Sequence, residues 1–181
     1  NCARLDAMSQ LGSGLFVAAR YEDALSVLET RLSTMRHLGA PERLMLVVRS
    51  NLASSYEALG RNEEAMNLQQ DVYSGCLRVN GEEHYDTLLA ANNYAVSLFG
   101  LDRFEEAKLL VRKTMPVARR ILGENEQLVL MMRSIYATAL YDDPAATLDD
   151  LREAVSTLED AGRTARRVLG GSHPLTKNIE G

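Results

Sequence analysis

Apolar residues recur at helical spacing along most of this chain. In the segment 104–122, for example, Leu109, Leu110, Val117, Ile121 and Leu122 follow the spacing of one helix face. No segment shows the alternation of apolar and polar residues, bounded by turns, that predicts a strand. The pattern therefore predicts an all-α fold whose helices cover 4–18, 21–37, 42–59, 62–79, 85–100, 104–122, 126–141 and 147–169.

The same short motifs return with a period of about 42 residues. An arginine, a variable residue and two acidic residues precede Ala24, Ala65 and Ala107, which lie 41 and 42 residues apart. The triplets that begin at Asn51 and Asn93 are also 42 residues apart. Because two independent landmarks share one period, we predict that each repeat is a pair of helices.

Glycines mark where these repeats end. Gly39, Gly81, Gly123 and Gly170 follow one another by 42, 42 and 47 residues, so the last repeat carries five extra residues, within 141–147. Glycine suits a helix end because it adopts the left-handed conformation at little cost. We expect a single domain over 1–181, with repeats at 4–39, 42–81, 84–123 and 126–170 and a partial cap at 172–181.

These motifs resemble tetratricopeptide repeats, in particular the longer repeats of kinesin light chains. The matching segments are 51–53, 60–65, 84–87, 122–123 and 172–176. Ile135 replaces the landmark asparagine, Asp102 replaces the turn glycine, and the fourth repeat lacks the acidic turn motif. The resemblance implies a right-handed α-α superhelix of about four antiparallel helix pairs with a partial C-terminal capping helix.

Composition narrows the function classes. The chain has 181 residues and a net charge of −5, which disfavours binding to a nucleic-acid backbone. No apolar run reaches the ~18 residues that a membrane-spanning helix needs. Cys2 and Cys76 do not have metal-ligand spacing and are expected to be reduced thiols, which favours the cytoplasm.

Candidate catalytic groups have structural interpretations. His37, His84 and His173 are not spaced for catalysis, and the last two occupy equivalent positions, as expected for helix starts. The Gly12–Gly14 segment lacks the third glycine of a dinucleotide loop, so we interpret it as a tight spot in the first helix pair. We therefore predict a protein that is not an enzyme and needs no cofactor or metal.

Two charged clusters also have structural interpretations at this stage. The aspartates at 142, 143, 149 and 150 lack the pattern of a calcium loop and predict a solvated insertion. Arg163, Arg166 and Arg167 complement the negative end of a helix more readily than they form a site for an acidic partner.

The first helix of each pair carries the candidate binding face, because those helices line the concave side of such repeat stacks. Positions four before, one before, at and three after the Asn landmark fall on one helical face. The resemblance implies that Asn51 and Asn93 hydrogen-bond a peptide backbone; alternatively, they tie neighbouring helices together. The candidate peptide-binding residues are Val47, Ser50, Asn51, Ser54, Leu89, Asn92, Asn93, Val96, Met131, Ser134 and Thr138.

We therefore expect a noncatalytic adaptor or scaffold that binds a peptide segment or a protein surface in its groove. The alternative is a structural module of a larger or oligomeric protein whose groove is filled by its own chain. In either case the segment 172–181 is expected to dock Leu175 and Ile179 on the apolar face of helix 147–169, and the natural chain to continue beyond Gly181.

Overall fold

The computed structural model describes residues 2–180, apart from the side chains of residues 2 and 180. Most of the described chain is helical, and no strand occurs within it, so the all-α prediction is confirmed. Each predicted helix boundary lies within two residues of the observed one. The helices are α1 (Cys2–Val17), α2 (Tyr21–His37), α3 (Glu42–Ala58), α4 (Asn62–Asn80), α5 (Tyr85–Phe99), α6 (Phe104–Leu122), α7 (Gln127–Tyr141), α8 (Leu148–Leu169) and α9 (Pro174–Glu180).

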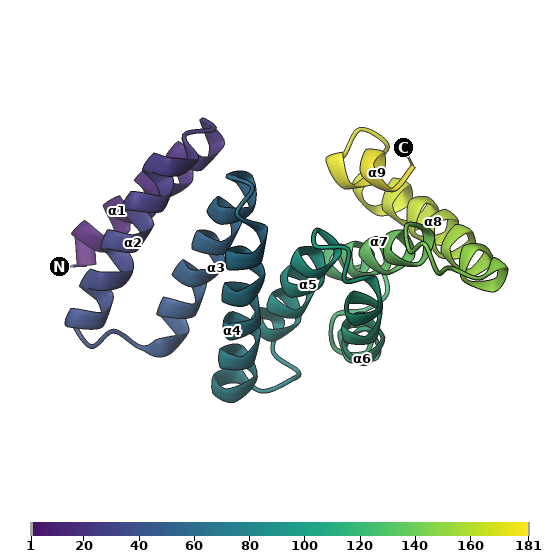
Figure 1. The fold of residues 1–181 in the computed structure, drawn as a ribbon, viewed down its shortest axis with the longest axis horizontal. Coiled ribbons are helices and arrows are strands. Elements are labelled where there is room, and N and C mark those ends of the chain that lie inside the picture. Colours follow the sequence, from purple (N-terminus) through teal and green to yellow (C-terminus); the bar gives the residue numbers. More distant parts are fainter. Residues whose placement is uncertain (1, 181) are drawn as a thin grey trace. The chain divides into compact units, whose positions relative to one another are not determined.

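The chain divides into two compact units, Asn1–Gly81 and Glu82–Gly181 (Figure 1). In the first unit α1 packs on α2, α2 on α3, and α3 on α4. In the second, α5 packs on α6 and α7, α7 also packs on α6 and α8, and the short α9 packs on α8. The boundary at Gly81 coincides with a predicted repeat end, and the single-domain organisation stays a prediction.

One turn geometry recurs inside three helix pairs. Gly60 has a φ of +73°, and the residues at the same repeat position, Ala19 and Asp102, both have a φ of +57°. This left-handed conformation is strained for alanine and milder for aspartate. The turn therefore keeps its shape where glycine has been replaced.

The recurring arginine after this turn pairs with the acidic residue three positions later. The Arg61 Nε donates to Glu64 at 2.6 Å, and the Arg103 Nε donates to Glu106 at 2.7 Å. These hydrogen bonds are the main cause that lowers the pKa of Glu64 and of Glu106. In the first pair the same contact joins Arg20 to Asp23.

The histidines at helix starts have the predicted structural role. The His84 Nδ1 accepts a hydrogen bond from the backbone N–H of Asp86 at 3.1 Å, at the start of α5. The His173 Nδ1 accepts the equivalent bond from Leu175 at 3.2 Å, at the start of α9. An imidazole nitrogen thus satisfies a backbone donor that the helix itself leaves open.

Small residues let the helices approach closely. A Cβ added at Gly75 of α4 would lie 2.6 Å from Leu46 Cδ2 of α3. A Cβ at Gly12 would lie 3.2 Å from Leu28 Cδ2, so the interpretation of Gly12 as a tight spot is confirmed. Six alanines of the helix pairs are all at most 1% exposed: Ala53, Ala65, Ala95, Ala107, Ala137 and Ala154.

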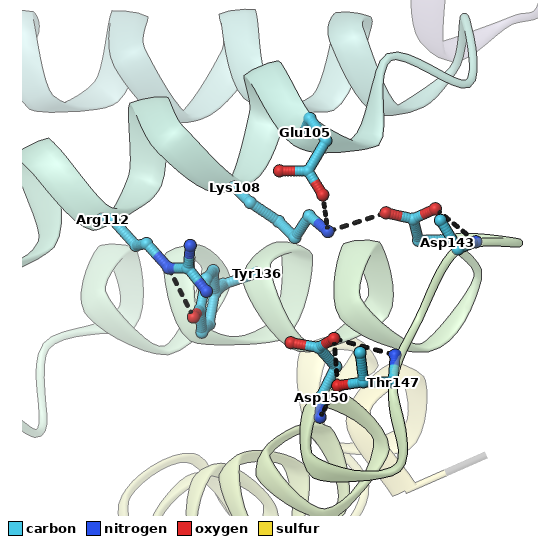
Figure 2. A network of polar contacts seen from close by, with 8 residues as sticks. Glu105, Lys108, Arg112, Tyr136, Asp143, Thr147 and Asp150 are labelled. Atoms are coloured by element: carbon cyan, nitrogen blue, oxygen red, sulfur yellow. Dashed lines mark hydrogen bonds and ion pairs between the residues drawn. The ribbon is translucent and has the colours of Figure 1, made fainter.

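The five-residue insertion before α8 is anchored to α6 by a buried lysine. The Lys108 Nζ lies 2.6 Å from a Glu105 oxygen and 2.7 Å from an Asp143 oxygen (Figure 2). The Lys108 and Asp143 side chains are only 5% and 8% exposed. The prediction of a fully solvated insertion was therefore wrong at Asp143, because Lys108 draws that carboxylate into the interior.

Hydrogen bonds set the charge states of this pair. Burial lowers the pKa of Lys108, but its bonds to Asp143 and Glu105 outweigh burial and leave that pKa above its ordinary value. The Lys108 ammonium, and next the backbone N–H of Ala145, hold the pKa of Asp143 below its usual value. Both groups therefore remain charged at neutral pH.

A second part of the network fixes α8 (Figure 2). The Thr147 Oγ1 accepts from the backbone N–H of Asp150, and the Asp150 carboxylate accepts from the backbone N–H of Thr147. This reciprocal arrangement is a capping box, which satisfies donors at a helix N-terminus.

Within the second unit, the C-terminal helix α9 docks on α8. Ile179 is 7% exposed and packs in one cluster with Ala161, Ala165 and Leu130, with Leu175 and Leu158 beside it. Docking of Leu175 and Ile179 is thus confirmed. The docked helix leaves part of α8 uncovered, since Val155 and Val168 remain 52% and 46% exposed.

Candidate functional site

In the first unit, the predicted face on α3 is open. Val47 is 51% exposed, Asn51 is exposed and Ser54 is half-buried. The side chains of Asn51 and Ser54 border a cavity of about 250 Å³. Its remaining lining comes from α1 and α2: Gly12, Ser13, Phe16, Val17 and Leu28.

This cavity combines an apolar wall with a small number of polar groups. Phe16 is held by an edge-to-face contact with Tyr21, with ring centroids 5.2 Å apart. Asn51 offers an amide that both donates and accepts, and Ser54 offers a hydroxyl whose proton is directed to the Ser50 carbonyl at 3.4 Å. Such a site can hold an apolar side chain and hydrogen-bond the backbone beside it.

Ser50 occupies a different part of the helix surface. Its Oγ lies 3.5 Å from the Gln69 Oε1, which is on α4. The position one before the Asn landmark therefore faces the second helix of the pair. This orientation toward the second helix explains why the equivalent residue in the second unit is buried.

That equivalent residue is Asn92 on α5, and it is only 1% exposed. Its Oδ1 is buried and has no hydrogen-bond partner. The prediction that Asn92 offers its amide to a ligand at the surface does not fit this burial. Leu89 is also partly buried and packs on the core of the second unit.

The other predicted residues of the second unit lie nearer the surface. Val96 is 42% exposed, and Asn93 is half-buried. On α7, Met131, Ser134 and Thr138 are half-buried, and the Thr138 Oγ1 donates to the Ser134 carbonyl at 2.9 Å. Whether these residues bind a ligand stays a prediction.

None of the eleven predicted residues is titratable, so a ligand bound by them would be recognised by shape and neutral hydrogen bonds. Among residues 2–180, no group of three or more His, Cys, Asp or Glu side chains is arranged to hold a metal ion. Within the same described part, no helix combines the length and the apolar content that crossing a bilayer requires.

Sequence reasoning missed the contribution of α1 to the cavity. Phe16 and Val17 are 37% and 87% exposed, which is high for large apolar side chains. The sequence signal was the apolar end of the segment 4–18, but the first repeat has no Asn landmark from which to count.

Residues 44–120 match the family model of the tetratricopeptide repeat. A comparison with curated protein sequences gives no match.

Solved structures match over almost the whole chain. One holds the nearly identical TPR-like repeats of a Podosopora anserina protein assigned as a kinesin light chain, in a variant form, with a TM-score of 0.79, 20% identity, and coverage of 98% of this chain and 82% of that one. BtubC (BKLC) from P. vanneervenii matches with a TM-score of 0.71 and 17% identity, over 97% of this chain and 75% of that one. These likenesses confirm the predicted α-α solenoid fold of helical repeats.

Proposed function

From a tetratricopeptide-repeat segment at 44–120, set in a repeat fold like that of kinesin light chains, we propose that this chain is a noncatalytic protein-interaction module. It acts as an adaptor or scaffold and holds an extended peptide segment or a protein surface against its first helices. We place it in the cytoplasm on its cysteine content.

The observation that carries this proposal is the cavity between α1, α2 and α3. It lies at Asn51 and Ser54, two positions that were chosen from the repeat register alone. The exposed Val47 lies one turn before Asn51 on the same helix, α3. An apolar ligand side chain in the cavity leaves the Asn51 amide beside the ligand backbone, where it can both donate and accept.

The test is capture of binding proteins by immobilised variants of the chain, followed by mass spectrometry. Val47→Asp and Asn51→Ala should reduce capture of the main partner by about tenfold, because one charges the apolar face and the other removes the amide. Val79→Asp is the matched control, since Val79 is 42% exposed but lies on α4.

Equal capture by all variants would refute the proposed face, provided circular dichroism shows that each variant is folded. The alternative, a groove filled by the protein's own chain, predicts a different result. In that case sedimentation would show self-association of the wild type, and Val47→Asp would weaken it while Val79→Asp would not.

A further inference from the structure

A second cavity, of about 540 Å³, lies in the unit Glu82–Gly181 and carries a net positive charge. Four arginines line it, from α6, α7 and α8, together with two acidic residues. The lining therefore carries a formal charge of +2 (4 − 2), although the whole chain carries −5. The charged residues are Arg119, Glu124, Arg133, Asp160, Arg163 and Arg167.

Two of these arginines are paired with carboxylates. The Arg119 Nε lies 3.3 Å from a Glu124 oxygen, and Arg163 forms a close ion pair with Asp160. The Arg167 guanidinium instead donates to the neutral Asn125 Oδ1 at 3.0 Å. Its charge is therefore not balanced by that contact.

Arg133 is the second arginine with an incompletely balanced charge. Its side chain is 10% exposed, its Nη2 lies 3.9 Å from Asp160 and 3.5 Å from the Thr157 carbonyl, and its Nε has no partner. Burial, and next the charge of Arg119, lower the pKa of Arg133. The existing contacts of this buried guanidinium are long. An anion that binds it would therefore gain a large favourable interaction.

A smaller cavity, of about 220 Å³, shares Arg119 and Arg133 with the first one. It is lined by the apolar Val111, Met115 and Pro116 of α6. The rest of its lining is polar, and includes Arg112, Tyr136 and Glu153. Figure 2 shows the Arg112 Nε donating to the Tyr136 hydroxyl, at 2.9 Å. The two cavities thus place a pocket with one apolar wall next to a cationic one.

We infer that this cleft binds the phosphate group of a phosphorylated peptide, with an apolar residue of that peptide in the adjoining pocket. A phosphoserine carries close to two negative charges and three acceptor oxygens, which match the two incompletely balanced arginines. Arginine is suited to such oxyanions because its planar donors bind two oxygens at once. The site uses residues outside the predicted first-helix face, so it does not depend on the function proposed above.

The test measures binding of the labelled peptide Gly-Leu-pSer-Leu-Gly by fluorescence anisotropy at constant ionic strength. Arg167→Gln should weaken binding about fivefold and Arg133→Gln about tenfold, because each removes a charged donor. Arg152→Gln is the control: it makes the same charge change on α8, but Arg152 pairs with Asp149 outside the cavity. If Arg133→Gln fails to fold, the exposed Arg167 still carries the test.

Four further probes separate the possible ligands. Replacing pSer by Ser or Glu, or both Leu residues by Gly, should each weaken binding, and inorganic phosphate should compete only at much higher concentration than the peptide. In the wild type, the Arg133 Nε–H resonance should shift on addition of the phosphopeptide. The inference is overturned if the phosphopeptide does not bind, if Arg152→Gln matches Arg167→Gln, if the Glu peptide binds equally, or if inorganic phosphate competes as well as the peptide.

Discussion

At the scale of single residues, the turn within the helix pairs shows what a sequence pattern leaves open. Gly60 fits its φ of +73° without strain, whereas Ala19 holds +57° at the same repeat position. The repeat register locates this turn. It does not reveal that alanine accepts the left-handed conformation, because the surrounding helix contacts impose it.

We expect Ala19→Gly to raise the free energy of unfolding by up to about 1 kcal/mol. Relief of the left-handed strain exceeds the extra unfolded-state entropy that glycine brings. Gly60→Ala, the reciprocal change, should lower it by a similar amount. Urea unfolding of both variants measures this, and a loss of stability in Ala19→Gly would show that the turn is unstrained.

The ion pair of Lys108 and Asp143 should make stability depend on acid. The pKa of Asp143 is lowered in the folded protein, so its contribution is complete above the unfolded value of about 3.9 and is lost as pH falls through the folded pKa. Asp143→Asn should therefore be less stable than the wild type at pH 7, and the difference should shrink below pH ~4.

Urea midpoints between pH 3 and pH 8 test this dependence. Asp142→Asn is the control, because it makes the same change at an exposed neighbour. If both variants follow the wild type at every pH, then Asp143 does not anchor the insertion.

At the scale of elements, local signals predicted the helices well. Glycines at repeat ends and histidines at helix starts act on their own backbone, so sequence spacing locates them. Contacts across 35 residues, such as that between Lys108 and Asp143, carry no local signal. For the same reason no local signal reveals that Arg133 is buried beside α8.

The docking of α9 leads to a prediction about the tail. Ile179→Ala should lower the free energy of unfolding by about 2 kcal/mol, since it removes a buried aliphatic side chain. Asn178→Ala is the control, because Asn178 is exposed. A chain that ends at Gly170 should uncover Leu158 and Leu169 and self-associate. A monomeric truncated chain with unchanged stability would contradict this role.

At the scale of the whole molecule, the repeat register determines the architecture. Which ligand binds depends instead on which side chains remain accessible at the surface. The register predicted ligand contacts at Asn51 and Ser54, which border a cavity. By the same rule it predicted a contact at Asn92, which is buried. It treats equivalent positions alike, while the packing of each pair decides which of them remain accessible. A binding face is therefore predicted more coarsely than the helices that carry it.

The central claim is that a protein partner binds the first-helix face. The most direct test is hydrogen–deuterium exchange of the chain in complex with the partner that the capture experiment recovers. Protection should concentrate on the first helices, above all on α1 and on α3 around Val47, Asn51 and Ser54, because a ligand in the 250 Å³ cavity covers them. The second helix α4 should exchange as in the unbound chain. Protection confined to α4, α6 and α8, with α1 and α3 unchanged, would contradict binding at the first-helix face.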